Sequence, residues 1–85
     1  MPSISSFYGI IIYMYFNEHN PPHFHLIYNE YKAIISINDG AITGSLPRRA
    51  LNMVYEWLDI HKDELLHNWE IMKDGIQPQK IEGLK

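Results

Sequence analysis

Three histidines lie close together in the sequence, at positions 19, 23 and 25, on either side of a proline pair in the segment EHNPPHFH. The chain has no cysteine, so its capacity for metal binding or nucleophilic chemistry is concentrated in this segment. The unperturbed pKa of imidazole, about 6.5, lies near neutrality, which suits it to metal binding, proton transfer and phosphate contact. The histidine segment is therefore the candidate site.

A metal site is one use of these residues. His19, His23 and His25 together with a water molecule would make a zinc site of the catalytic type, with Glu18 as a fourth ligand or a base. His19, however, precedes the rigid proline pair, and nothing in the sequence brings its ring to within ~2.1 Å of a shared metal. The sequence therefore predicts no cofactor, and zinc is the metal that these residues would bind if they bind one.

A histidine-dependent ribonuclease is a second use. His23 and His25 would act as general acid and base, and Arg48 or Arg49 would stabilise the phosphate if the helix start lay beside the histidine strand. Charge opposes this reading, because the net charge is -3 and six acidic residues face only two lysines between positions 56 and 74. RNA is therefore disfavoured as a partner, since phosphate binding depends on clustered basic side chains.

The favoured interpretation is structural or partner-binding use of the same loop. His19 and His23 would bond to carbonyl groups around the prolines, which lack an N-H donor. The loop would then shape a surface for another protein, anchored by aromatic side chains. The residues assigned to binding are His19, Phe24, Tyr28 and Arg49.

Periodicity indicates an α+β fold with an antiparallel sheet of three or four strands. Apolar residues over 7–16 predict a central strand, and alternation over 23–28 predicts a second strand that places His23 and His25 on one face. Asn29 favours a tight turn into a third strand over 31–37, and an Asn-Asp-Gly turn precedes a short strand over 41–44.

Two helices follow the predicted sheet and pack on one of its faces. The first begins at Pro47 and the second spans about 62–74, with a break expected near 60–62. Residues 76–85 form an extended tail that docks on the sheet edge, on a partner or on nothing. The length of 85 residues predicts one domain over 1–85.

The cellular location is also predicted from composition. The absence of cysteine and of a recognisable leader fits a reducing cytoplasm. The longest apolar run, over 7–16, falls short of the ~20 residues needed to cross a bilayer, so no membrane association is expected.

Several motifs resemble a small bacterial family. They are Tyr8-Gly9-Ile10, Met14-Tyr15, His19-Asn20-Pro21-Pro22-His23-Phe24-His25, the stretch from Gly44 to Leu51, Glu56-Trp57 and Asn68-Trp69-Glu70. Together they resemble the domain-of-unknown-function family numbered 4160, over residues 1–81. Members of that family are often encoded beside another small protein, as in toxin and antitoxin pairs. The resemblance therefore implies a small protein partner from an adjacent gene and establishes no reaction.

A weaker likeness is to ribonuclease toxins of the HicA type. The shared features are a histidine at a strand start, a hairpin, and a Gly-x-Leu-x-Arg helix start, here Gly44 to Arg48. This chain lacks their leading helix and is acidic where they are basic. We therefore expect a protein-binding component of a toxin-antitoxin-like pair, with a ribonuclease toxin and a zinc-binding domain as alternatives.

Overall fold

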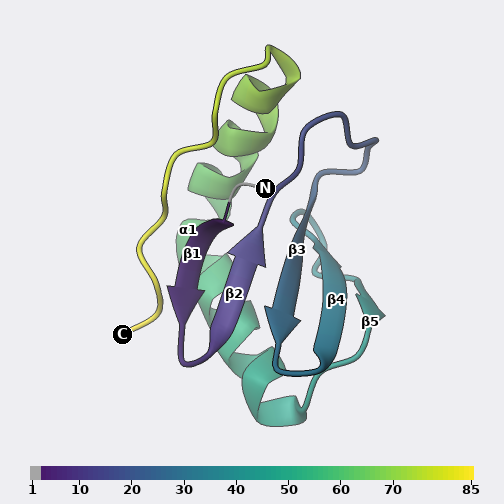
Figure 1. Cartoon of the computed structure of the whole chain (residues 1–85), viewed down its shortest axis with the longest axis vertical. Coiled ribbons are helices and arrows are strands. Elements are labelled where there is room, and N and C mark those ends of the chain that lie inside the picture. Colours follow the sequence, from purple (N-terminus) through teal and green to yellow (C-terminus); the bar gives the residue numbers. More distant parts are fainter. Residues whose placement is uncertain (1–2) are drawn as a thin grey trace.

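A computed structural model describes residues 3–85 as a five-stranded antiparallel sheet with one long helix across one face (Figure 1). The strands are β1 (Ser3–Phe7), β2 (Ile10–Tyr13), β3 (His23–Tyr28), β4 (Tyr31–Ser36) and β5 (Ile42–Gly44), and the helix is α1 (Arg48–Lys73). Each strand pairs with the next along the chain, in the order β1-β2-β3-β4-β5. The α+β class is thus confirmed, while the strand and helix counts differ from those predicted. The first two residues of the predicted domain lie outside the described part.

The single strand predicted over 7–16 is wrong, because this run contains a hairpin turn. Tyr8 and Gly9 both have positive φ, 49° and 83°, as the two central residues of a tight hairpin turn require. Phe7 pairs with Ile10 across the turn, and both side chains are buried. The apolar run continues through the turn because both strands contribute to the same core, so composition hides the boundary between β1 and β2.

The strands that follow lie close to their predicted positions. β3 spans His23–Tyr28, and Asn29, with a φ of 52°, turns the chain into β4. Gly40, with a φ of 73°, helps to turn the chain from β4 into β5. Period-two alternation and turn residues were therefore sufficient to predict this half of the sheet.

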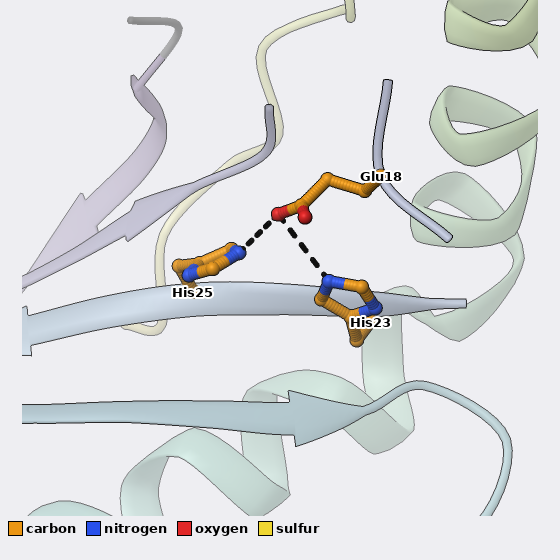
Figure 2. A group of neighbouring side chains, drawn as sticks. All are labelled: Glu18, His23 and His25. Atoms are coloured by element: carbon orange, nitrogen blue, oxygen red, sulfur yellow. Dashed lines mark hydrogen bonds and ion pairs between the residues drawn. The ribbon is translucent and has the colours of Figure 1, made fainter. Parts of the chain in front are cut away.

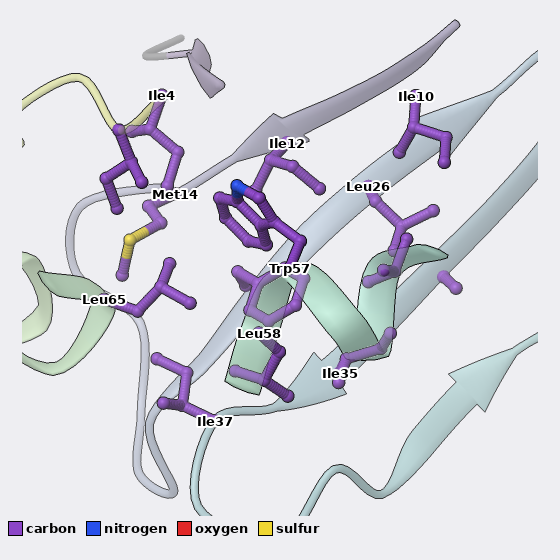
Figure 3. Close-up of a cluster of buried hydrophobic side chains, with 14 of the residues drawn as sticks. Ile4, Ile10, Ile12, Met14, Leu26, Ile35, Ile37, Trp57, Leu58 and Leu65 are labelled. Carbon is purple, nitrogen blue, oxygen red and sulfur yellow. The ribbon is translucent and has the colours of Figure 1, made fainter. Parts of the chain in front are cut away.

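The core lies between the sheet and α1 (Figure 3). Phe24 and Leu26 of β3 point into it, whereas His23, His25 and Ile27 alternate onto the other face. Fully buried side chains around its centre include Ile4, Ile10, Ile12, Met14, Ile35, Ile37, Val54, Trp57 and Leu65. One face of the sheet is thus closed by α1, and the opposite face, which carries the histidines, is open except where Trp69 of α1 meets His23.

The helical segment is one element rather than the two helices predicted, but the break expected between them is present. This break, expected near 60–62, is a kink, because His61 has non-helical angles (φ -112°, ψ 17°) inside α1. His61 Nδ1 lies 2.6 Å from Glu64 Oε1, one turn further along. Among residues 3–85, no helix is long and apolar enough to cross a membrane.

The C-terminal tail docks on the molecule. It runs beside β1 and along α1, as the yellow segment of Figure 1 shows. The Ile81 N-H donates to the Ile4 carbonyl (2.8 Å), and the Ile81 side chain is buried. The Asn68 amide donates to the Gln79 carbonyl and accepts from the Gln79 N-H, both at 2.9 Å. Of the three outcomes left open by the sequence, docking at the sheet edge is the one observed.

Substituting Asn68 should loosen this tail. Asn68 is 1% exposed, and Asn68→Ala removes both hydrogen bonds to Gln79, so the free energy of unfolding should fall by about 1–3 kcal/mol in urea denaturation. Asn52→Ala, on the exposed side of the same helix, is the control for the change in helix propensity. Equal stability of the two variants would contradict a structural role for Asn68.

Candidate metal centre

His23 and His25 lie at the start of β3 and project from the face of the sheet opposite the core, where the C-terminal part of α1 reaches only His23, through Trp69. His25 pairs with Tyr13 of β2 and with Ile34 of β4, so these three side chains project on the same side. The side chains of His23 and His25 are 15% and 24% exposed. The two rings therefore share one face and remain partly accessible to solvent.

Glu18 completes the cluster from the loop between β2 and β3. Its side chain reaches over the strand so that one carboxylate oxygen faces both rings (Figure 2). Glu18 Oε1 makes a short hydrogen bond with His25 Nε2 and lies 3.3 Å from His23 Nε2. One ligand atom from each of the three residues lies within 4.8 Å of the other two. Two histidines and one carboxylate therefore converge on a single point.

The hydrogen bonding of His23 fixes which of its nitrogens carries the proton. His23 Nδ1 lies 2.8 Å from the Pro21 carbonyl oxygen, which can only accept, so Nδ1 is the donor. In the neutral ring, Nε2 then presents its lone pair to the Glu18 carboxylate. Two lone pairs that face each other repel, so this contact is held either by a proton on Nε2, which makes His23 a cation that donates to Glu18, or by a metal ion between the two atoms. A backbone carbonyl behind a histidine ligand is a common arrangement in metal sites.

Glu18 carries the negative charge of the cluster. Partial burial by itself raises the pKa of its carboxyl group, but hydrogen bonds from His25 and His23 outweigh that effect and hold the pKa below its usual value. Glu18 is therefore ionised at neutral pH. Partial burial, Tyr13 and the Glu18 charge together raise the pKa of Tyr15, which keeps its hydroxyl protonated.

Aromatic side chains hold the two imidazole rings in place. Trp69 of α1 packs against His23, with 5.1 Å between ring centroids, and Tyr15 meets His25 edge-on at 4.5 Å. Tyr15 in turn stacks on Tyr13. These contacts restrict the rotamers of both histidines, and restricted rotamers reduce the entropy lost when a ligand binds.

The third member of the cluster differs from the one that the sequence suggested. His19 is exposed and does not belong to the group of converging ligand atoms. Its neighbour Glu18, considered in the sequence only as a fourth ligand or base, takes that place. A carboxylate beside a histidine cluster was the available signal, but the path of the loop decides which side chain turns inward.

The predicted arginines lie far from the histidines. Arg48 and Arg49 form the first turn of α1, whereas Trp69, which contacts His23, lies near its other end. Twenty-one residues of helix separate Arg48 from Trp69, which is about 30 Å at the α-helical rise. Figure 1 shows α1 starting at the end of the sheet opposite the start of β3. The structure therefore does not bring Arg48 to His23 and His25.

The two aromatic residues predicted to contact a partner, Phe24 and Tyr28, differ in exposure. Phe24 is 0% exposed, and its ring meets Trp57 at 5.7 Å, so it belongs to the core and is not available to a partner. Tyr28 is half-buried and stacks on Tyr31 at the end of the β3-β4 hairpin. Only Tyr28 of these two can therefore contact another molecule.

Fold and site together define a small α+β protein with a carboxylate and two histidines gathered at one end of an open sheet face. The chain belongs to the family described as Domain of unknown function (DUF4160), whose match spans residues 9–70. That range contains the whole Glu18, His23 and His25 cluster and confirms the resemblance seen in the sequence. No curated protein and no solved structure matches the chain.

Proposed function

We propose that this protein binds a divalent metal ion of the zinc type through Glu18, His23 and His25. The observation that carries the proposal is the orientation of His23. Its Nδ1-H is engaged by the Pro21 carbonyl, and its Nε2 faces the Glu18 carboxylate oxygen at 3.3 Å. A metal ion between these atoms would replace the proton that otherwise links His23 Nε2 to the Glu18 carboxylate, and would bond to both atoms.

The spacing of the donor atoms fits such an ion. In a tetrahedral zinc site with bonds of 2.0–2.1 Å, neighbouring ligand atoms are about 3.3 Å apart. The distance between Glu18 Oε1 and His23 Nε2 is 3.3 Å, and all three donors lie within 4.8 Å of one another. For a metal to enter, the short contact between Glu18 and His25 must open and His25 Nε2 must lose the proton that it donates to Glu18.

The ligand set also indicates what the metal would do. Two neutral imidazoles and one carboxylate would supply three ligands of a zinc ion, and such sites keep a further position for water or substrate. Zinc held by these residues would lower the pKa of a bound water and so would supply a nucleophile for hydrolysis at neutral pH. Metal-assisted hydrolysis is the reaction class that this arrangement supports best.

The other two interpretations have less support. A histidine-dependent ribonuclease needs a cation beside the scissile phosphate, and Arg48 starts α1 at the end opposite Trp69, the residue of α1 that contacts His23. A protein partner from an adjacent gene stays a prediction of the family resemblance, and Phe24 is no longer one of its contacts. The metal proposal, by contrast, requires only residues whose donor atoms already lie close together, Glu18, His23 and His25.

Zinc binding by single variants tests the proposal. Protein purified without an affinity tag and dialysed against zinc should bind one ion per chain, measured by elemental analysis. Glu18→Gln, His23→Ala and His25→Ala should each weaken binding by at least about 100-fold, because each removes a ligand, whereas even outer-shell changes cost 10 to 100-fold.

His19→Ala and His67→Ala are the matched controls, since both remove an exposed histidine outside the cluster. Both should bind zinc as the unmodified protein does. Loss of zinc in His19→Ala equal to that in His25→Ala, or stoichiometric zinc in all three cluster variants, would contradict the proposed ligand set.

A further inference from the structure

A hollow on the open face of the sheet adjoins the proposed metal site. Its volume is about 380 Å³, within the usual range of small-molecule pockets. The side chains that line it include Tyr15, His25, Ile27, Lys32, Ile34 and Thr43. His25 belongs both to this hollow and to the metal cluster, so a molecule held in the hollow is next to the metal.

The strand register orders these side chains along the hollow. His25 pairs with Ile34, and two residues further along Ile27 pairs with Lys32. At about 3.3 Å per residue, the two pairs are roughly 7 Å apart along the strands. The hollow therefore runs from the metal ligand His25, across Ile34 and Ile27, to Lys32.

The chemistry of the hollow differs between its middle and its two ends. Ile27 and Ile34 are half-buried and offer no hydrogen-bonding groups. Lys32 is exposed, and within the described residues 3–85 its ammonium group makes no ion pair. A fitting ligand is thus apolar in the middle, anionic at the Lys32 end and a Lewis base at the metal end.

Resting on the proposed metal site, we propose that the hollow binds a small organic acid. Its carboxylate pairs with Lys32, its apolar segment lies on Ile27 and Ile34, and an oxygen atom at its other end reaches the metal held beside His25. The positive charge at both ends selects an anion. The short apolar floor suits a single small molecule rather than a polymer.

Adipate is a direct probe of this arrangement, because it carries a carboxylate at each end of a short apolar chain. In calorimetric titration of the zinc-loaded protein, adipate should bind at least about tenfold more tightly than hexanoate, which has one carboxylate, as expected for a charge-assisted contact. The neutral 1,6-hexanediol should not bind. Removal of zinc should weaken adipate binding by a similar factor.

Lys32→Met keeps most of the length of the side chain and removes its charge, so it should abolish the advantage of adipate over hexanoate while zinc binding stays unchanged. Lys85→Met, at an exposed lysine in the tail, is the matched control and should bind adipate normally. Equal binding of adipate and hexanoate, or full adipate affinity in Lys32→Met, overturns the small-acid proposal and leaves the metal site standing. A protein that takes up no zinc overturns both.

Discussion

Saturating zinc should raise the melting temperature of this protein by roughly 10–20 °C. An ion that binds only the folded state at 100 times its dissociation constant adds about 2.7 kcal/mol to the free energy of unfolding. For a domain of 60–100 residues, 1 kcal/mol shifts Tm by about 4–8 °C. The three proposed ligands come from the β2-β3 loop and from β3, so they converge only when that hairpin is folded. Melting followed by circular dichroism, with and without zinc, measures the shift.

Two controls separate this site from other histidines. A chelator should reverse the shift, and His25→Ala should show none, whereas His19→Ala should keep all of it. Magnesium should have little effect, because it prefers oxygen ligands in octahedral geometry over imidazole. A shift of equal size in His25→Ala would place the ion elsewhere, for example at His61 or His67 on α1.

The shared face of His23 and His25 could be predicted because it depends only on local geometry. In a strand, alternate side chains point the same way, and residues 23–28 alternate clearly between apolar core positions and the opposite face. The identity of the third group could not be predicted in the same way. Glu18 and His19 lie in a loop without regular periodicity, and the contacts of that loop with β3 decide which one faces inward.

The position of Arg48 relative to the histidines could have been predicted from the sequence. It depends on how many antiparallel strands lie between the histidines and the start of α1. β3 runs away from the histidine end, β4 returns to it, and β5 runs away again, so α1 begins at the opposite end of the sheet. The predicted strands after residue 22 already contain this parity. The likeness to ribonuclease toxins placed Arg48 beside the histidines because the motifs occur in the same order along the sequence. The order of motifs does not show at which end of the sheet the helix begins.

The turn between β1 and β2 could not be predicted from the sequence, for a different reason. Tyr8 is an unusual residue at positive φ, because a side chain with a Cβ atom is strained there. The usual turn residues, asparagine and aspartate before glycine, are absent, and Gly9 alone marks the turn. Burial of Phe7 and Ile10 on either side stabilises the hairpin, and that burial depends on α1 and the tail, which lie far along the sequence.

Phe24→Ala should destabilise the protein by about 3–5 kcal/mol, a large part of the stability of so small a domain. The side chain is 0% exposed and meets Trp57 in the centre of the core, so its removal leaves a cavity between β3 and α1. Urea denaturation measures the loss, and Ile60→Ala, at a position that is 61% exposed, should change stability by no more than about 0.5 kcal/mol.

Unchanged stability of Phe24→Ala would instead mean that this ring faces solvent, as the partner-binding interpretation requires. The same variant also tests the metal site when its stability is measured with zinc, because Phe24 lies between the two proposed ligands His23 and His25 in β3. If zinc binds the folded state of Phe24→Ala as it binds the unmodified protein, saturating zinc should restore about 2–3 kcal/mol of the lost stability. Restoration would show that the side chain supports the fold and that the three ligands still converge without it.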